Sequence, residues 1–565
     1  MKRYQGIPAA AGVAWAPAAV ARTVAGSKIP ATLDEAVDAC LEQVRALRDK
    51  AGADLGRDSA EIFSAYETLL TDPYLLDPVR ELQRQGRPLR QALEEALEAR
   101  AAVFLQAKND YLRERAEDIR NIKTMLLRKL NGSMLEFSMP AGDAQVIVAA
   151  ESLSPADTMA LDKKRLAGIV TRYGGATSHV VILAKALGIP AVTGVEQAAE
   201  IPDGALLLVD GAAGQVTVEP DASVLDAARA VRAKQQAFEA RLRALPAGDT
   251  FTADGQQVYV SVNAGGAGDL DGLDMASLHG VGLYRTEFLF VERETAPTLE
   301  EQQAAYRRMF DRLDGRELVV RTLDIGGDKT VPYLDLPREE NPFLGCRGIR
   351  LCFRHEELMR RQFSALLRAA DGRAFSVMFP MVNTAAEFKK ARAIWREEAA
   401  KAAADGVAVS PDIRLGVMIE TPAAMLCADT LAACVDFASI GTNDLTQYIL
   451  AADRGNPQAG VALSVYSPAV VRAVAHIIRV FAGQGVKISV CGEAGSDTAF
   501  LPLMLGMGLR HVSVSPSAVA RVRYSIFRTD CGAQAELLRR VLQMEDEAEI
   551  RAALADGAPD REDAT

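Results

Sequence analysis

The stretch from Leu415 to Asp444 contains two apolar runs, each ending in an acidic residue: LGVMIE at 415–420 and VDFASIGTND at 435–444. The apolar parts, 415–419 and 435–440, have the length and composition of buried strands. Six further runs of this kind occur in the second half of the chain: Val258–Val262, Val281–Tyr284, Leu318–Val320, Phe375–Phe379, Ile488–Val490 and His511–Val514. Helical patterns separate most of them. Eight such strands over about 290 residues predict a (β/α)8 barrel, whose usual size is about 250 residues.

Polar residues come directly after, or at the end of, most of these strands: Asn263, Arg285, Arg321, Glu420, Asn443, Asp444 and Cys491. In a (β/α)8 barrel the carboxyl ends of the strands build the active site. We therefore predict that these side chains meet at one mouth of the barrel.

The chemistry of this mouth follows from its residue types. Arg285, Arg321, Arg347 and Arg454 together would clamp the carboxylate and phosphate of a small polyanion. For any one arginine, an ordinary surface position is the alternative. Glu420 and Asp444 provide two carboxylates, which suits Mg²⁺. A salt bridge between these acids and the arginines, with no metal, is the alternative to that site.

The first half of the chain has a different pattern. Apolar residues recur at helical spacing from Leu33 to Leu130, which predicts a group of helices. Strand patterns flank this segment at residues 5–20 and again from Gln145, so the helices are expected to be inserted into a compact α/β fold. A breaker-free stretch at 222–245 predicts a connecting helix that ends at Pro246.

A glycine-rich run, GGATSH at 174–179, precedes a predicted helix at 180–187. The glycines allow a ligand to approach the backbone, and Thr177 and Ser178 can cap the helix. The free N–H groups at a helix start favour an anion, and the imidazole of His179 is nucleophilic near neutral pH. From these local features, a simple helix cap is about as good an interpretation as a nucleophile.

The run at 174–179, together with AKALGIPAV at 184–192, resembles the mobile phosphohistidine domain of the phosphoenolpyruvate-utilising enzymes. The second half is similar to the barrel of one branch, enzyme I of the bacterial sugar phosphotransferase system. The matching stretches are GLYRTEFLF at 282–290, RTLDIGGDK at 321–329, ETPAA at 420–424, SIGTNDLTQY at 439–448 and CGE at 491–493.

The resemblance implies a role for each matching residue. His179 would carry the phosphoryl group. Thr158 matches a position that contacts this histidine. Cys491 would protonate the enolate of pyruvate, although a structural role is the usual one for an isolated buried cysteine. Phosphoenolpyruvate would be bound by Arg285, Arg321, Asn443, Asp444 and Arg454, to which we add Arg347 from its own position. Glu420 and Asp444 would hold Mg²⁺.

The chain departs from the family at four places. Ala176 and Val180 replace residues common beside the phosphohistidine, and the loops at 461–463 and 494–497 differ from the usual sequences near the barrel mouth. These changes remove no predicted ligand. They concern the reactivity of His179 and the closing of the loops.

The domain organisation follows. Residues 1–20 and 140–221 are expected to form the swivelling phosphohistidine domain, and 21–139 an inserted helical subdomain that binds the phosphocarrier protein HPr. A linker helix at 222–248 would lead to the phosphoenolpyruvate-binding barrel at 249–565, through which the family forms homodimers. Four residues match the HPr-binding stretch: Asp58, Glu61, Tyr66 and Asp72.

The expected activity is phosphoryl transfer from phosphoenolpyruvate to His179 and then to a histidine of HPr, with release of pyruvate, as the first step of sugar uptake. A regulatory, non-sugar branch is one alternative. A synthase or dikinase is another, but the roughly 140 residues before the phosphohistidine domain are too few for a nucleotide-binding domain of the kind those enzymes carry.

Composition limits the remaining classes. The net charge of −11 argues against nucleic-acid binding. The seven cysteines include no C-x-x-C pair, which favours a reducing compartment and a cytoplasmic location. There is no apolar run of about 18 residues, so no membrane span is expected.

Overall fold

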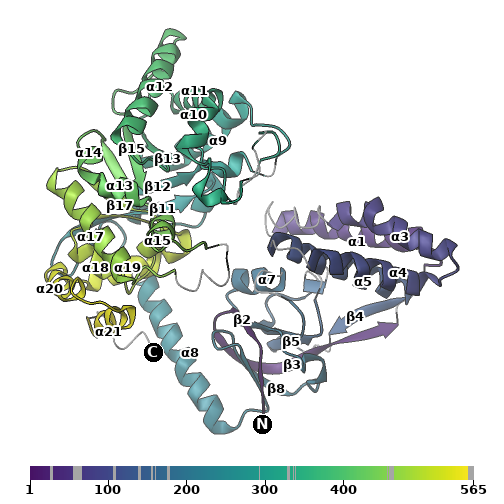
Figure 1. Cartoon of the computed structure of the whole chain (residues 1–565). Coiled ribbons are helices and arrows are strands. Elements are labelled where there is room, and N and C mark those ends of the chain that lie inside the picture. Colours follow the sequence, from purple (N-terminus) through teal and green to yellow (C-terminus); the bar gives the residue numbers. More distant parts are fainter. Residues whose placement is uncertain are drawn as a thin grey trace. The chain divides into compact units, whose positions relative to one another are not determined.

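The computed structural model describes the whole chain except residues 26–29, 55–65, 106–109, 138–141, 154–156, 159–160, 175–178, 292, 328–330, 335, 337–338, 455, 457–462 and 558–565. The described residues form two compact units, residues 1–237 and 238–565 (Figure 1).

The second unit is a closed barrel of eight parallel strands, as the apolar runs predict. The strands, in spatial order, are β11 (Gln257–Ala264), β12 (Gly280–Arg285), β13 (Glu317–Arg321), β14 (Ser376–Phe379), β15 (Arg414–Ile419), β16 (Phe437–Ile440), β17 (Lys487–Val490) and β18 (His511–Val514). Pairing of β18 with β11 closes the ring, with Tyr259 opposite His511. A short strand, β10 (Thr250–Phe251), pairs antiparallel with β11.

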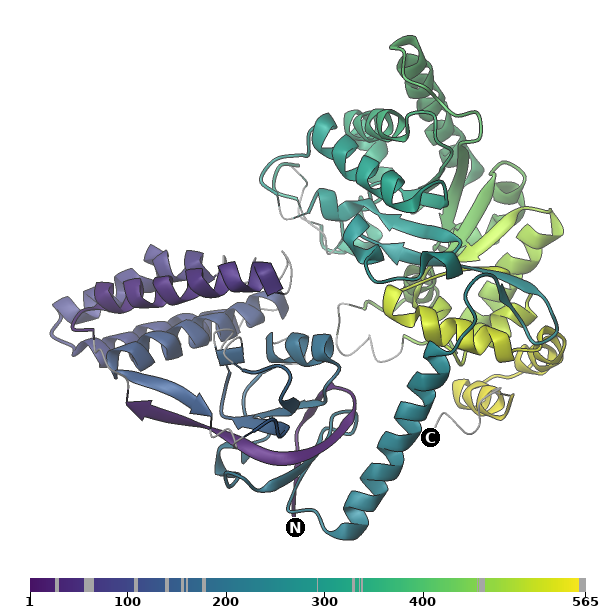
Figure 2. The ribbon, with the colours of Figure 1, turned by 180° about the vertical axis from the view of Figure 1, so that it is seen from behind.

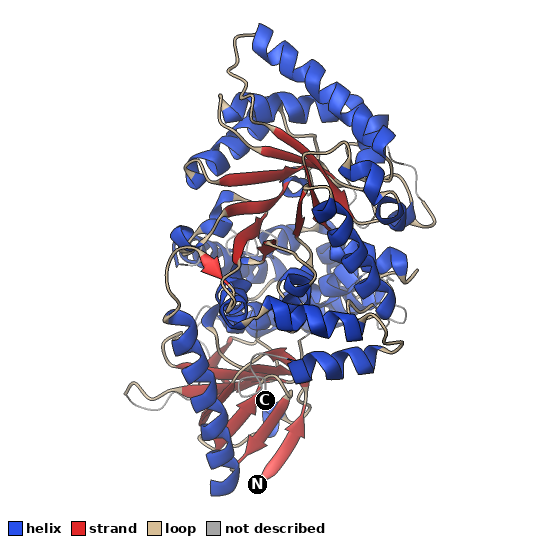
Figure 3. Cartoon of the chain, turned by 90° about the vertical axis from the view of Figure 1, so that its left-hand side faces the viewer, coloured by secondary structure: helices blue, strands red, loops and turns tan. Residues whose placement is uncertain are grey.

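Helices surround the barrel strands (Figure 3). They are α9 (Leu299–Leu313), α10 (Ile349–Arg354), α11 (Glu356–Ala370), α12 (Ala385–Ala404), α13 (Pro422–Leu426), α14 (Ala428–Ala432), α15 (Thr442–Ile449), α17 (Pro468–Gly483), α18 (Leu501–Gly506), α19 (Val519–Arg528), α20 (Cys531–Val541) and α21 (Glu547–Gly557). Capping boxes mark the starts of two of these helices: Thr298 with Glu301 at α9, and Thr384 with Glu387 at α12. The large apolar core lies between strands and helices, and a small second cluster comprises Leu283, Val319, Met378, Met418, Phe437 and Cys491.

The first unit contains a mixed sheet whose central strands are parallel. Its strands are β1 (Lys2–Gln5), β2 (Ile7–Ala10), β3 (Val13–Ala25), β5 (Val146–Ala150), β6 (Leu166–Thr171), β7 (Ala191–Thr193), β8 (Leu206–Asp210) and β9 (Gln215–Val218), in the spatial order β1-β9-β8-β3-β5-β6-β7-β2. Every residue of β5 and β6 is buried. Alternate residues of β5 belong to two separate apolar clusters, as expected when both faces of a parallel sheet are covered.

A helical group lies between β3 and β4 (Ser133–Phe137) in the sequence. It comprises α1 (Leu33–Asp54), α3 (Pro73–Arg84), α4 (Leu89–Leu105) and α5 (Asp110–Leu130), which share one apolar core. Figure 2 shows β3 running on from the sheet to pair with β4 beside these helices. Strand β3 therefore continues past the boundary expected at residue 20. The apolar pattern predicts helices between Leu33 and Leu130 without marking α3 separately. Helix α3 starts at Pro73, and Asp72 caps it by accepting a hydrogen bond from the backbone of Tyr74.

Helix α8 (Ala222–Arg243) matches the predicted connecting helix and contains the boundary between the two units. Within the described residues, no helix is both long and apolar enough to cross a membrane.

Candidate active site

The predicted strand-end residues of the barrel do lie at the carboxyl ends of its strands. Arg285 and Arg321 are the last residues of β12 and β13, and they are paired in register. Glu420 follows β15, and Cys491 follows β17. Asp444 lies in the first turn of α15, after β16. The strand order thus brings residues far apart in the sequence to one mouth.

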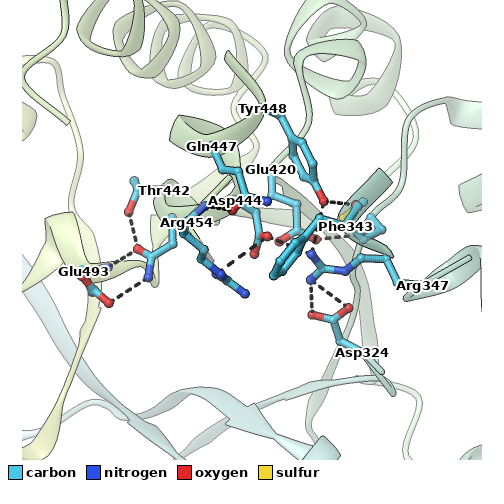
Figure 4. A network of polar contacts seen from close by, with 12 residues as sticks. Asp324, Phe343, Arg347, Glu420, Thr442, Asp444, Gln447, Tyr448, Arg454 and Glu493 are labelled. Atoms are coloured by element: carbon cyan, nitrogen blue, oxygen red, sulfur yellow. Dashed lines mark hydrogen bonds and ion pairs between the residues drawn. The ribbon is translucent and has the colours of Figure 1, made fainter. Parts of the chain in front are cut away.

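Arg347 lies at the centre of a buried network of polar contacts (Figure 4). Its Nη1 donates to Asp444 Oδ1 at 2.9 Å and to the Tyr448 hydroxyl at 3.2 Å. Its Nη2 donates to both oxygens of Asp324, at 3.0 and 3.2 Å. Burial alone would lower the pKa of Arg347, but the carboxylates of Asp324 and Asp444 outweigh burial and raise this pKa above its ordinary value. The guanidinium is therefore always charged.

Arg321 is the second buried guanidinium of the mouth. It forms an ion pair with Glu287, and its Nη1 lies 3.1 Å from Asp324 Oδ2. Its neighbour Arg285 is only partly buried and makes no hydrogen bond or ion pair with the described residues. Arg285 thus keeps all its donors available.

Glu420 is a buried carboxylate under electrostatic strain. Its Oε1 accepts a 2.6 Å hydrogen bond from the backbone of Met381, a residue held at φ +57°. Burial, with the charges of Asp444 and Asp324, raises the pKa of Glu420 to about 8. Gly441 makes room for this carboxylate, because a Cβ there would lie 3.0 Å from Glu420 Oε2.

The donors around Glu420 fit a hard divalent cation. Glu420 Oε2 is buried and has no hydrogen-bond partner among the described residues. A dication between Glu420 and Asp444 would relieve the repulsion that raises the Glu420 pKa. The described residues contain no cluster of three or more potential ligands, but Mg²⁺ commonly takes only one or two protein carboxylates and completes its shell with substrate oxygens and water.

Cys491 is almost fully buried in the small apolar cluster of the barrel. Its thiol lies 3.7 Å from the carbonyl oxygen of Ile440. Burial raises the pKa of the thiol to about 11, against the lowering effect of Arg321 and Arg285. The thiol is therefore protonated at neutral pH, as a proton donor must be.

Two further predicted residues line the mouth. Asn443 exchanges two hydrogen bonds with Glu493, one to the carboxylate at 3.0 Å and one from the backbone at 2.9 Å. Arg454 lies 3.9 Å from Asp444 Oδ1, with its guanidinium 5.1 Å from the centre of the Phe343 ring. Asn443 thereby connects the first turn of α15 with the segment after β17 that carries Cys491.

The phosphohistidine motif lies in the first unit. His179 is the first residue of helix α7 (His179–Leu187), and it follows β6 in the chain. Gly174 has φ +130°, a conformation that favours glycine. Residues 175–178, including Ala176, fall outside the described part of the chain. Thr158, predicted to contact His179, is buried.

Of the residues predicted to contact a phosphocarrier, Asp58 and Glu61 are outside the described residues. Tyr66 is buried in the helical core, where its hydroxyl contacts Asp118 at 3.3 Å and Asn121 at 3.0 Å. This burial excludes Tyr66 from the docking surface, because its ring and hydroxyl are used inside the helical group. Asp72 caps helix α3.

Sequence reasoning missed several residues of the mouth. Glu287 and Asp324 lie within the motifs at 282–290 and 321–329, where the sequence predicts no role for them, yet both pair with Arg321. Tyr448 lies one helical turn after Asp444, a spacing that could have identified it. No sequence signal marks Met381, whose contribution is a backbone N–H group.

Three family models match the chain. The model described as "PEP-utilising enzyme, PEP-binding domain" matches residues 239–531, the mobile-domain model matches 142–214, and the N-terminal model matches 5–115. Together they cover both units.

Curated relatives match over nearly the full length. The phosphoenolpyruvate-protein phosphotransferase of Listeria innocua is 40% identical over 520 residues, which cover 92% of this chain and 91% of the relative. The protein of the same name from Geobacillus stearothermophilus is 38% identical, with 97% of each chain covered. Among solved structures, an NMR structure titled Enzyme I (nEIt) is 27% identical and covers 42% of this chain and 99% of its own, with a TM-score of 0.33.

Proposed function

Because the chain belongs to the phosphoenolpyruvate-protein phosphotransferases of the PEP-utilising enzyme family, we propose that its barrel mouth binds phosphoenolpyruvate and that His179 carries the phosphoryl group. The observation that carries this assignment is the convergence of Arg321, Arg347, Glu420 and Cys491 on one end of the barrel, with a thiol that keeps its proton. Arg285, Arg454, Asn443 and Asp444 complete the proposed substrate site.

The proposed transfer has one bond forming and one breaking at phosphorus. The Nε2 atom of His179 attacks the phosphorus of phosphoenolpyruvate, and the bond from phosphorus to the enol oxygen breaks. The electron pair of that bond remains on the enolate. Cys491 then gives the proton of its thiol to the methylene carbon, and pyruvate leaves. The arginines stabilise the charge that spreads over the phosphoryl oxygens.

Enzymes of this family use a divalent metal ion, and we assign Mg²⁺ to Glu420 and Asp444. When bound there, Mg²⁺ would neutralise negative charge on the phosphoryl group. The unpartnered Glu420 Oε2 supports this choice of ligand.

The acceptor after His179 is a phosphocarrier protein. We propose that it is HPr, that it docks on the helical group α1–α5, and that the enzyme is a homodimer joined through its barrels. All seven cysteines are unpaired, which supports a reducing, cytoplasmic location. In this scheme residues 1–20 and 140–221 swivel as one domain, residues 21–139 provide the docking site, 222–248 form the link, and 249–565 form the barrel.

The assignment is tested by incubating the enzyme with phosphoenolpyruvate and Mg²⁺ and analysing it by mass spectrometry. We expect an acid-labile phosphate on His179, one pyruvate released per site, and transfer of the phosphate to added HPr. The His179→Ala variant should bind phosphoenolpyruvate but accept no label. Labelling that is unchanged in this variant would refute the role of His179, and phosphate passing to AMP would indicate a synthase.

A further inference from the structure

We propose that Asp324 is a positioning residue that holds the guanidinium groups of Arg321 and Arg347 at the spacing required by phosphoenolpyruvate. This inference rests on the proposed function, in which both arginines bind the substrate. Asp324 itself has no direct role in the chemistry. It acts through the two arginines.

The geometry of Asp324 is that of a bridge. Its Oδ2 lies 3.1 Å from Arg321 Nη1 and 3.0 Å from Arg347 Nη2, and its Oδ1 lies 3.2 Å from Arg347 Nη2. Each arginine also pairs with a second carboxylate, Glu287 for Arg321 and Asp444 for Arg347. Among the described residues, Asp324 is the one carboxylate that pairs with both. Its position therefore sets the distance between the two guanidiniums.

The backbone around this bridge is packed unusually closely. Gly348, at φ +56°, donates its N–H to Ile325 O at 3.2 Å, and a Cβ there would lie 3.3 Å from Asp324 Oδ1. At Gly326, φ +103°, a Cβ would lie 2.7 Å from the Cβ of Arg347. These two glycines let the segment carrying Arg347 lie directly against the segment carrying Asp324.

The arginines retain donors for a ligand. The Nε atoms of both Arg321 and Arg347 are buried and have no hydrogen-bond partner among the described residues. A buried, unpaired donor costs stability, and each of these donors belongs to a guanidinium that Asp324 already fixes. The arrangement fits preorganised donors that a phosphate or carboxylate oxygen completes.

Two other roles for Asp324 make different predictions for the binding of phosphoenolpyruvate. If Asp324 were only a counter-ion competing with the anionic substrate, its neutralisation would tighten the binding of phosphoenolpyruvate. If it were only a structural ion pair, its loss would change stability and leave the kinetics of the folded enzyme unchanged. A positioning role requires weaker substrate binding in an enzyme that is still folded.

The test compares Asp324→Asn with the wild type in phosphoenolpyruvate-dependent pyruvate release, at fixed Mg²⁺ and with HPr in excess. We expect the KM for phosphoenolpyruvate to rise by about tenfold or more, because a displaced guanidinium loses its substrate contacts. Glu398→Gln is the matched control, since Glu398 is a buried carboxylate on α12 that pairs with Arg360 at 2.8 Å. Its KM should equal that of the wild type. An unchanged or lower KM in Asp324→Asn would overturn the proposal.

A second variant separates position from charge, and it serves if Asp324→Asn does not fold. Asp324→Glu keeps the negative charge but moves the carboxylate outward by one carbon. Because the site is closely packed, we expect the extra methylene group to lower its thermal stability, but the retained ion pairs should keep it folded while its KM stays raised. Recovery of both quantities would refute a positioning role. Failure of the proposed function would look different: Arg321→Ala would leave the KM unchanged, or His179 would take no label in the wild type.

Discussion

At the scale of single residues, Cys491 shows how a barrel interior controls proton chemistry. The thiol belongs to a small apolar cluster, and burial raises its pKa to about 11 although the charges of Arg321 and Arg285 act to lower it. The proton therefore stays on sulfur through the neutral range, and a donor-controlled loss of rate appears only as the pH rises toward that pKa. An exposed cysteine, with an ordinary pKa of about 8.5, would begin to lose its proton much earlier.

Replacing Cys491 by Ala removes the proposed donor to the enolate. We expect the rate of pyruvate release to fall by about 10²-fold or more, which is the usual contribution of a positioned general acid. The measurement is steady-state pyruvate formation with HPr in excess. Cys434→Ala, at a partly buried site outside this cluster, should keep the wild-type rate. A wild-type rate in Cys491→Ala would assign the proton to another group.

Gly441→Ala tests the space around the proposed metal ligand Glu420. The new Cβ would lie 3.0 Å from Glu420 Oε2 and from its Cβ, so the carboxylate must shift. We expect a higher Mg²⁺ concentration for half-maximal activity, by roughly tenfold, because a displaced ligand weakens the site. Gly483→Ala, where a Cβ meets no atom within 4 Å, is the control. Equal Mg²⁺ dependence in both variants would speak against Glu420 as a ligand.

At the scale of secondary-structure elements, the barrel strands could be read from the sequence because each is a short apolar run, and most have a polar residue at or just after their end. Helix α3 could not be read from the apolar pattern, since Pro78 lies inside it and proline usually ends a helix. The same holds in the site. Arg321, Glu420 and Asp444 were found because strand ends converge in this fold. The pairing of Asp324 with Arg347 depends on the path of the 339–348 loop, which no local pattern specifies.

The helical group should depend on its own apolar core. Leu93 on α4 is fully buried there, whereas Val103 on the same helix is 58% exposed. We expect Leu93→Ala to lower the free energy of unfolding of the helical group by about 2–5 kcal/mol, and Val103→Ala to change it little. Calorimetry can follow this transition. Equal effects of the two substitutions would contradict the burial pattern.

The amino ends of the barrel strands carry a separate group of titrating side chains. His511 stacks on Tyr259, with ring centres 4.5 Å apart, and lies close to His279 and Lys487. Lys487 forms an ion pair with Glu317, and His279 lies 3.6 Å from the same carboxylate. Burial, then the charge of Lys487, lowers the pKa of His511 to about 3. This histidine is therefore neutral in the folded barrel.

His511 should make the barrel less stable in acid. The unfolded chain binds a proton at this position near pH 6.5, whereas the folded chain does not until about pH 3, so stability falls as the pH drops through this window. One proton corresponds to at most about 1.4 kcal/mol per pH unit. Denaturant unfolding at several pH values between 7 and 4 gives the free energy of unfolding as a function of pH. This free energy should fall less steeply with decreasing pH for His511→Phe, which keeps the stacked ring, than for the wild type. The same pH dependence of the free energy of unfolding in both proteins would exclude His511 as the cause of the loss of stability in acid.

At the scale of the whole molecule, helix α8 joins the two units, and the boundary between them falls within it. Lys234, exposed near its middle, is a site where the helix can be broken without changing either core. Lys234→Pro costs the helix about 3 kcal/mol. We expect single-turnover phosphorylation of His179 to slow, while phosphoenolpyruvate still raises the thermal stability of the barrel. In the control variant Lys234→Ala, His179 should be phosphorylated at the wild-type rate. A wild-type rate in Lys234→Pro would show instead that α8 only tethers the two units.

The raised pKa of Cys491 also bears on chemical damage. Peroxides and alkylating agents attack the thiolate, and a thiol with a pKa of about 11 is ionised in only about one molecule in 10⁴ at pH 7. Partly exposed thiols, such as that of Cys427, meet these reagents in solution, whereas Cys491 is enclosed by the barrel. The burial that keeps a proton ready for the enolate therefore also makes the sulfur a poor target for oxidation.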